Sequence, residues 1–194
     1  DEKITVLSGI PFMLKEIVHD PHFDAAAFAS VRVGFFGGAS MPHADIVTLV
    51  ERIGYEHFIQ IYGMTELHGI SMTSLATDSK EHQLSTCGKS LPGFEMILVD
   101  SDSGDVIEGI GTGEAWYKGR THLTYEGLTE EELSQFYSPD GYFKTGDVLH
   151  RRADGRYEFA SRVKDLIKVG GENVAAAEIE IVLKDHPKVF NVQV

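Results

Sequence analysis

Four short segments of this sequence combine glycines with hydroxyl, carboxylate or cationic side chains that could together bind a nucleotide. In chain order they are Gly37–Ser40, Gln60–Glu66, Tyr142–Asp147 and Arg162–Val174. The small residues Gly37-Gly38-Ala39-Ser40 follow a short apolar run and would let a flat ligand approach the backbone closely. A structural turn explains the same four residues, so this segment alone does not identify a site.

The second segment, Gln60-Ile61-Tyr62-Gly63-Met64-Thr65-Glu66, follows a buried strand. Open α/β sheets bind ligands at the carboxyl ends of their strands. Tyr62 could stack on a base, Thr65 could hydrogen-bond a phosphate, and Glu66 could hold Mg²⁺ through its oxygens. The alternative is a helix N-terminus that is capped by Thr65.

The third segment, Tyr142-Phe143-Lys144-Thr145-Gly146-Asp147, ends in a carboxylate at a strand start. Asp147 could accept hydrogen bonds from both hydroxyls of a ribose 2′,3′-diol, and bonds to a charged acceptor are strong. A turn aspartate that binds local backbone N–H groups is the alternative.

The fourth segment gathers three cations, Arg162, Lys164 and Lys168, ahead of Gly170-Gly171 in an otherwise acidic chain. This favours an anionic ligand. Local ion pairs explain the same cations, and the candidate partners are Glu172, Glu178 and Glu180.

Apolar periodicity predicts the elements that position these segments. In the first half, strands alternate with helices, which is typical of an α/β domain with parallel pairing. From Gly88 the pattern changes to hairpin-like β structure, and a charged link at Arg162–Asp165 is the expected domain boundary. The predicted helices are Pro11–Ser30, interrupted by Pro21, Pro42–Ile53, a short helix capped by Thr129, and Val174–Leu183; the predicted strands include Val31–Phe36, Phe58–Tyr62, Phe94–Asp100, Gly113–Lys118, Leu166–Val169 and Val189–Val194.

The composition narrows the class of protein. The chain has 194 residues, of which 42% are hydrophobic and 24% charged, and this is ordinary for one sizeable core. Its 17 basic and 30 acidic side chains give a net charge of −13, which disfavours binding to nucleic acid or to a membrane surface. No apolar run is long enough for a membrane span. The single cysteine, Cys87, rules out an internal disulfide framework and favours the cytoplasm.

Taken together, the four segments resemble the ANL superfamily, which contains acyl-CoA synthetases, luciferases and peptide-synthetase adenylation domains. The strings Gly-Gly-Ala-Ser, Tyr-Gly-Met-Thr-Glu, Lys-Thr-Gly-Asp and Arg-Val-Lys-Asp with Gly-Gly-Glu-Asn-Val occur in the family's order. The resemblance implies the C-terminal part of a large α/β domain with a β-rich lobe at residues 1–161. A hinge and the beginning of a small α+β domain would follow at 162–194.

The resemblance also implies an activity: an acid–CoA ligase of fatty-acyl or similar carboxylates. Such an enzyme makes acyl-AMP from ATP, and CoA then displaces the AMP. The Gly-Gly-Glu-Asn-Val loop favours acyl-CoA synthetases, while a luciferase-like enzyme, a peptide-synthetase domain and a non-catalytic nucleotide-binding relative are the alternatives. ATP, Mg²⁺ and coenzyme A are the expected co-substrates, and a small-molecule carboxylate is the expected partner.

Site residues carry over from the family motif by motif. Thr65 and Glu66 are the catalytic pair, and Glu66 holds Mg²⁺. The nucleotide site is expected to contain Gly38, Ala39, Ser40, Gln60, Ile61, Tyr62, Gly63, Thr65, Asp147 and Arg162. The hinge and the CoA-facing loop are expected to contain Lys164, Lys168, Gly170, Gly171 and Asn173.

Two family motifs do not occur in this sequence. One is the Gly- and Ser/Thr-rich phosphate loop ending in Pro-Lys, and the other is the C-terminal catalytic lysine. We therefore expect the 194 residues to be an internal section of a longer ligase, with little or no turnover alone. The cytoplasm is the expected location, with an organelle left open; the oligomeric state and the acyl chain length are not predicted.

Overall fold

The computed structural model describes residues 2–121, 126–170, 172–184, 186, 188–189 and 192–194. Contacts divide the chain into two compact units, and each is considered by itself. The first contains residues 1–94 with 120–122, and the second contains 95–119 with 123–194. The predicted boundary at Arg162–Asp165 falls inside the second unit and stays a prediction.

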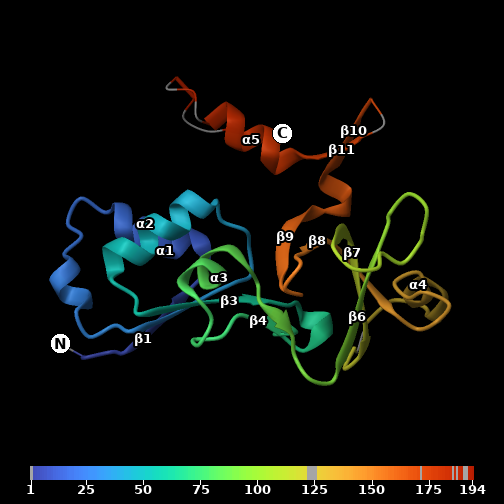
Figure 1. The fold of residues 1–194 in the computed structure, drawn as a ribbon, viewed down its shortest axis with the longest axis horizontal. Coiled ribbons are helices and arrows are strands. Elements are labelled where there is room, and N and C mark those ends of the chain that lie inside the picture. The colour runs from blue at the N-terminus through green and yellow to red at the C-terminus, as the bar shows by residue number, and fades with distance from the viewer. Residues whose placement is uncertain (1, 122–125, 171, 185, 187, 190–191) are drawn as a thin grey trace. The chain divides into compact units, whose positions relative to one another are not determined.

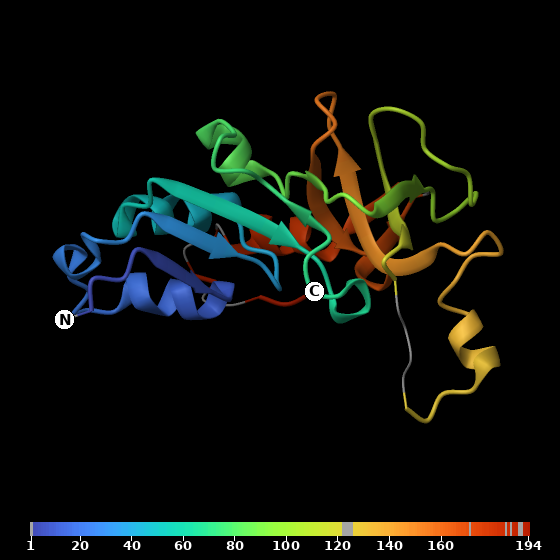
Figure 2. The same cartoon turned by 90° about the horizontal axis from the view of Figure 1, so that it is seen from below.

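The first unit is built on a sheet of five strands in the order β1-β2-β3-β4-β5. Strands β1 (Val6–Gly9), β2 (Val33–Phe36) and β3 (His57–Tyr62) are parallel, and Figure 2 shows their arrows pointing the same way. The short strands β4 (Met72–Thr73) and β5 (Lys89–Ser90) continue the sheet in antiparallel pairing. Adjacent parallel strands place their carboxyl ends at one edge, so the segments after β2 and β3 are neighbours.

Helices α1 (Pro11–His19) and α2 (His43–Ile53) connect these parallel strands and share one apolar core with them (Figure 1). The predicted apolar face of α2 is confirmed, because its four members are all buried. Pro42 occupies the N-cap of α2, and Gly54 ends the helix with φ +81. The core consists of Leu14, Val18, Val31, Phe36, Ile46, Leu49, Val50, Ile53, Tyr55 and Phe58.

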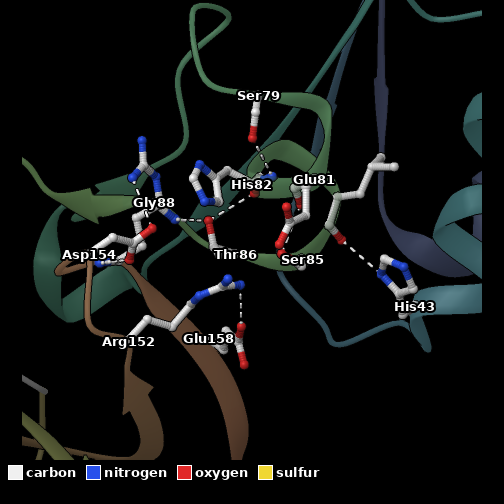
Figure 3. Close-up of polar contacts among 12 residues, drawn as sticks. His43, Ser79, Glu81, His82, Ser85, Thr86, Gly88, Arg152, Asp154 and Glu158 are labelled. Atoms are coloured by element: carbon white, nitrogen blue, oxygen red, sulfur yellow. Dashed lines mark hydrogen bonds and ion pairs between the residues drawn. The ribbon is translucent and has the colours of Figure 1, made fainter. Parts of the chain in front are cut away.

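A third helix, α3 (Lys80–Ser85), is fixed to β3 by side-chain hydrogen bonds. The Ser79 hydroxyl caps it by accepting from the His82 N–H, as Figure 3 shows. At its other end, the Thr86 hydroxyl donates to the His82 carbonyl and accepts from the Gly88 N–H. The polypeptide between β4 and β5 therefore has its own polar framework.

The second unit contains a four-stranded sheet in the order β6-β7-β8-β9. Its strands are β6 (Phe94–Val99), β7 (Gly111–Gly119), β8 (Phe143–Arg151) and β9 (Tyr157–Arg162), and β7, β8 and β9 pair in antiparallel fashion. In β7 alternate side chains are buried, as in a sheet with one solvated face, whereas β8 has three consecutive buried residues, Asp147, Val148 and Leu149. The predicted β-rich lobe is confirmed in this part of the chain.

Shorter elements complete the two units. Single 3₁₀ turns occur at Ala25–Phe28, Thr65–Leu67 and Val163–Asp165, and α4 (Glu130–Ser134) begins with the predicted Thr129 cap. After the charged link, β10 (Leu166–Val169) and β11 (Glu172–Ala175) form an antiparallel hairpin that leads into α5 (Ala176–Lys184). Among the described residues, no helix is long and apolar enough to cross a membrane.

Three boundary predictions were wrong. The helix predicted for Pro11–Ser30 ends at His19, before Pro21. Val174 and Ala175 are not helical, because they pair with Ile167 and Leu166 in the hairpin, and the helix starts at Ala176. The predicted strand at 189–194 is absent from its described residues, 189 and 192–194; residues 190 and 191 lie outside the described part.

Candidate active site

The first two motifs lie side by side because β2 and β3 are parallel neighbours. Phe36 pairs with Gln60, so Gly37 comes next to Ile61. A Cβ on Gly37 would lie 2.4 Å from Ile61 Cγ1 and 2.7 Å from the Ile61 carbonyl oxygen. Only glycine permits this approach. The contact places the Gly-Gly-Ala-Ser turn directly against the strand that leads into Tyr-Gly-Met-Thr-Glu.

Beyond Gly37 the chain turns toward solvent. Gly38, Ala39 and Ser40 are exposed, and Gly38 adopts φ +83. A turn is therefore present, as the structural alternative required, and the three residues of the predicted nucleotide site are also accessible to a ligand.

After β3 the backbone folds tightly upon itself. A Cβ on Gly63 would lie 1.8 Å from the carbonyl oxygen of Gly69, so no side chain fits there. The Gly69 N–H donates to the Met64 carbonyl at 3.0 Å and closes the loop around the 3₁₀ turn Thr65–Leu67. This loop brings Thr65 and Glu66 to the carboxyl end of β3.

The structure excludes a capping role for Thr65. Met64, not Thr65, occupies the N-cap, and no side-chain cap bond is present there. The capping alternative was therefore wrong. The Thr65 side chain is exposed and Glu66 is half-buried. A single carboxylate fits the usual manner of Mg²⁺ binding, in which one or two carboxylates act with substrate phosphates and water.

Tyr62 and Gln60 are more enclosed than a ligand-facing role suggests. Tyr62 has an exposed fraction of 7%, so only a small part of its ring is open to a base. The Gln60 side-chain amide donates to the Gln83 carbonyl at 3.0 Å, and its backbone N–H donates to the Ser74 hydroxyl. Gln60 thus serves the packing of α3 against β3.

In the second unit, Asp147 and Arg162 come together because β8 and β9 pair at these positions. Arg162 Nε lies 3.3 Å from Asp147 Oδ1. Asp147 is buried, with an exposed fraction of 5%, whereas the Arg162 side chain is half exposed. Asp147 lies within β8, so the alternative of a turn aspartate was wrong. The pair presents one carboxylate and one guanidinium, which suits a diol and an anion respectively.

A bulge before Asp147 explains its position. The pairing between β7 and β8 is interrupted between Glu114 and Trp116, where three residues of the Lys-Thr-Gly-Asp motif lie opposite. The Thr145 hydroxyl donates to the Ala115 carbonyl at 2.7 Å and accepts from the Asp147 N–H at 3.1 Å. The Glu114 carboxylate accepts from the Gly146 N–H at 2.9 Å. Bulges of this kind often redirect side chains next to active sites.

The predicted hinge and glycine loop lie in the same unit. Lys164 is in the 3₁₀ turn Val163–Asp165 that joins β9 to β10. Lys168 and Asn173 face each other across the hairpin, and both donate to the carboxylate of Asp102. Gly170 has φ +62 in the connecting turn, and the predicted residue Gly171 lies outside the described residues.

The ion pairs of Arg162 and Lys168 differ from those expected. Arg162 binds Asp147 and Lys168 binds Asp102, and both partners come from the β-rich lobe. Of the glutamates proposed from the sequence, the Glu172 side chain lies outside the described part. The hydrogen bond from Lys168 lowers the pKa of the Asp102 carboxyl below its ordinary value.

Two positions of the second unit, Glu114 and Asp102, were missed from the sequence. Gly37 stood inside a quoted motif, but its contact with Ile61 depends on strand register. Glu114 and Asp102 act on segments 32 and 66 residues away in the chain. The Asp-Ser-Asp-Ser-Gly-Asp segment around Asp102 is typical of a turn, and that pattern does not indicate a contact with a distant hairpin.

Residues 1–125 match the family described as AMP-binding enzyme, which is more than half of the chain. The chain belongs to this AMP-binding enzyme family. Its mixed α/β fold is that of the ANL adenylating enzymes, as the sequence predicted.

Individual relatives agree with this assignment. The chain is 31% identical over 193 residues to YngI of Bacillus subtilis, provisionally named an acyl-CoA synthetase, and covers 35% of it. It is 30% identical to the mitochondrial medium-chain acyl-CoA ligase ACSF2 of Danio rerio and covers 32% of that protein. In both cases 100% of this chain is matched.

Among solved structures, ATP-bound MatB from Rhodopseudomonas palustris superimposes with a TM-score of 0.83 at 25% identity. The match includes 96% of this chain and 36% of MatB. The chain thus spans about a third of the length of the relatives it matches. No cluster of three or more potential metal ligands occurs among the described His, Cys, Asp and Glu residues.

Proposed function

We propose that this AMP-binding enzyme chain is the central section of an acid–CoA ligase acting on fatty-acyl or similar carboxylates. A substrate carboxylate oxygen attacks the α-phosphorus of ATP, the bond to the β-phosphate oxygen breaks, and pyrophosphate leaves. The thiol sulfur of CoA then attacks the acyl carbon, the acyl–oxygen bond breaks, and AMP leaves as the thiol proton passes to solvent. The observation that carries this proposal is that the whole of this chain matches about a third of proteins named as acyl-CoA synthetases and ligases.

The pair of buried Asp147 and half-exposed Arg162 supports the nucleotide part of the proposal. Asp147 would accept both ribose hydroxyls, and Arg162 would hold it in place and add positive charge. A buried carboxylate is costly to desolvate unless charged or hydrogen-bonding partners surround it. A diol with two donors is such a partner, and the bulge at Thr145 and Gly146 fixes the carboxylate before the nucleotide arrives.

The other site residues that were predicted from the sequence have roles that are consistent with the proposed ligase reaction. Gly38, Ala39, Ser40, Ile61, Tyr62 and Gly63 would border adenine and the acyl group, Thr65 would contact phosphate, and Glu66 would hold Mg²⁺. The metal would neutralise phosphate charge when bound. Lys164 would lie at the hinge that moves the segment after Arg162 between the two half-reactions, and Lys168, Gly170, Gly171 and Asn173 would face CoA. The cytoplasm stays the proposed location, and the mitochondrial name of ACSF2 makes an organelle the alternative.

The direct test measures CoA-dependent AMP release by the full-length protein with a panel of fatty and aromatic acids. We expect turnover with at least one acid. Asp147→Ala should raise the KM for ATP about tenfold or more, because bonds to a charged acceptor contribute about 1.5–3 kcal/mol each. Asp140→Ala, which removes an exposed carboxylate from the same unit, is the matched control.

Two outcomes would change this assignment. If no acid supports AMP release by the full-length protein, the ligase proposal fails and a non-catalytic nucleotide-binding role replaces it. If acyl-AMP forms but only an amine or oxygen acts as acceptor, the first half-reaction stands and the CoA step does not. The 194-residue chain alone should show little or no turnover, because the phosphate loop and the C-terminal lysine are missing from its sequence.

A further inference from the structure

One carboxylate joins the β10–β11 hairpin to the β-rich lobe. Lys168 Nζ donates to Asp102 Oδ1, and Asn173 Nδ2 donates to Asp102 Oδ2 at 3.4 Å. Lys168 and Asn173 are directly opposite each other in the antiparallel register. Asp102 therefore holds both strands of the hairpin. The pair of Lys168 and Asn173 is separated from the glycine turn by one further cross-strand pair.

The loop that carries Asp102 is well fixed. Asp100 Oδ1 accepts from the backbone N–H groups of Asp102 at 3.0 Å and Ser103 at 2.8 Å. The Asp105 N–H donates to the Ser103 hydroxyl, and Val99 pairs with Val106 at the base of the loop. These bonds set the direction of the Asp102 carboxylate without any help from the hairpin.

The hairpin itself is incompletely packed on the sheet. A cavity of about 330 Å³ is lined by β-lobe residues, including Asp100 and Ser161, and by Leu166, Asn173 and Glu178 from the hairpin and α5. The cavity therefore interrupts the apolar contact between the hairpin and the β-rich lobe. Polar contacts at the edge of the hairpin thus contribute more to holding it in place. Among the described residues, Lys168 and Asn173 make side-chain hydrogen bonds from the hairpin to the β-rich lobe, both to Asp102.

We propose that Asp102 is a positioning residue that holds the β10–β11 hairpin, and with it the glycine turn, in one arrangement after the hinge. Because this rests on the proposed function, Asp102 would set the balance between the half-reaction that forms acyl-AMP and the half-reaction that uses CoA. It touches no substrate and acts through Lys168 and Asn173.

The strength of the contact suits a clamp that must also release. The side chains of Lys168 and Asp102 are 66% and 51% exposed. Exposed ion pairs shift an equilibrium by only about 1.5- to 5-fold, and salt screens them. The Lys168 hydrogen bond lowers the pKa of the Asp102 carboxyl below its ordinary value, which already lies well below neutral pH.

The first experiment uses the 194-residue chain and measures amide hydrogen exchange in residues 166–175. Asp102→Ala should exchange about threefold faster there, and high salt should accelerate exchange in the unmodified chain but not in this variant. Asp105→Ala removes an exposed carboxylate from the same loop and should leave hairpin exchange unchanged. The exchanged pair Asp102→Lys with Lys168→Asp should restore protection.

The second experiment uses the full-length protein and measures acyl-AMP formation and thioester formation separately. Asp102→Ala should change the ratio of the two rates about threefold, Asp105→Ala should not, and the exchanged pair should recover part of the change. A purely structural role would lower both rates together and would not be rescued by reversing the charges.

The two experiments separate this inference from the proposed function. Absence of acyl-AMP formation in the unmodified full-length protein would defeat the proposed function, and the exchange data would still decide whether Asp102 clamps the hairpin. Equal rates of amide hydrogen exchange in the hairpin of Asp102→Ala and Asp105→Ala would overturn the proposed role of Asp102 as a clamp, whatever the catalytic result. Faster exchange with an unchanged rate ratio would overturn the role of Asp102 in the balance of half-reactions.

Discussion

The two units hold their site residues by different means. In the first, the motifs after β2 and β3 are fixed by backbone contacts, such as the close approach of Gly63 to Gly69, and by buried amide hydrogen bonds to α3. In the second, Lys168 and Asn173 are held by the exposed carboxylate of Asp102. The first arrangement cannot be adjusted without unfolding, whereas the second can open at small cost.

This difference matches the tasks proposed for the two parts. Preorganised groups at the carboxyl ends of parallel strands bind a nucleotide well when they do not move. A segment that must face two successive reactions needs contacts that form and break on the timescale of turnover. If the comparison is right, substitutions in the first unit should cost stability, and substitutions in the second should alter local opening and salt sensitivity.

The largest effect is expected from Gly63→Ala. Its methyl group would overlap the Gly69 carbonyl, which is backbone and cannot move aside without distorting the loop. We expect a loss of about 3 kcal/mol or more in the free energy of unfolding. Thermal or urea denaturation of the 194-residue chain measures it.

Gly69→Ala is the matched control for this substitution. Its added methyl group meets open space, although Gly69 has φ +99 and any side chain there is strained. The expected cost is about 1–2 kcal/mol from backbone strain alone. Equal destabilisation by the two substitutions would show that the crowding at Gly63 does not fix the loop.

The next effect concerns Gln83, which is 3% exposed and bonds to three backbone groups. Its Oε1 accepts from the Phe58 N–H, and its amide nitrogen donates to the Ala76 and Asp78 carbonyls. Gln83→Met should cost about 2–4 kcal/mol, because buried backbone groups lose their partners. Gln60→Met, which removes one such bond, should cost about 1 kcal/mol. Similar urea midpoints for the two variants would contradict this ranking.

The sequence was sufficient to predict the elements of both units because their apolar patterns are regular. The buried face of α2 and the strand before Tyr62 followed directly from spacing. Errors occurred where tertiary pairing overrode local pattern. Val174 and Ala175 continue an apolar helical pattern, yet pairing with β10 makes them a strand.

The candidate site was predictable as motifs but not as contacts. The pairing of Asp147 with Arg162 depends on the register of β8 and β9, and the clamp by Asp102 joins residues 66 apart in the chain. Gln60 was expected beside the ligand cavity, and its amide instead bonds to Gln83. Side-chain direction at a strand end depends on which neighbour supplies an acceptor, and one sequence does not contain that information.

Alkaline pH should lower the stability mainly of the first unit, which contains Tyr55. Burial raises the pKa of Tyr55 from 10.0 to about 12. Its folded-state pKa is raised, so its stabilising contribution is complete below pH 10 and is lost as pH rises from 10 to about 12. At pH 11 the free energy of unfolding should be lower by about 1.4 kcal/mol, which is the equivalent of one pKa unit. Urea denaturation of the unmodified chain and Tyr55→Phe at pH 8 and pH 11 measures it, and the same pH dependence in both would refute the assignment.

The smallest effect belongs to the ion pair of Arg152 and Glu158 in the second unit. Arg152 Nη1 lies 2.9 Å from Glu158 Oε1, and the two side chains are 27% and 37% exposed (Figure 3). Pairs of this kind contribute about 0.2–1 kcal/mol and weaken with salt.

A double-mutant cycle with Arg152→Ala and Glu158→Ala isolates their coupling from the other interactions of Arg152. This pair is less exposed than that of Lys168 and Asp102, whose side chains are 66% and 51% exposed, so its coupling gives an upper estimate for the exposed charged contacts of this unit. A coupling above about 2 kcal/mol that does not change with salt would mean that charged contacts here are as fixed as the amide bonds of Gln83. The contrast between a rigid first unit and a releasable second unit would then fail, even if every substitution in the first unit behaved as expected.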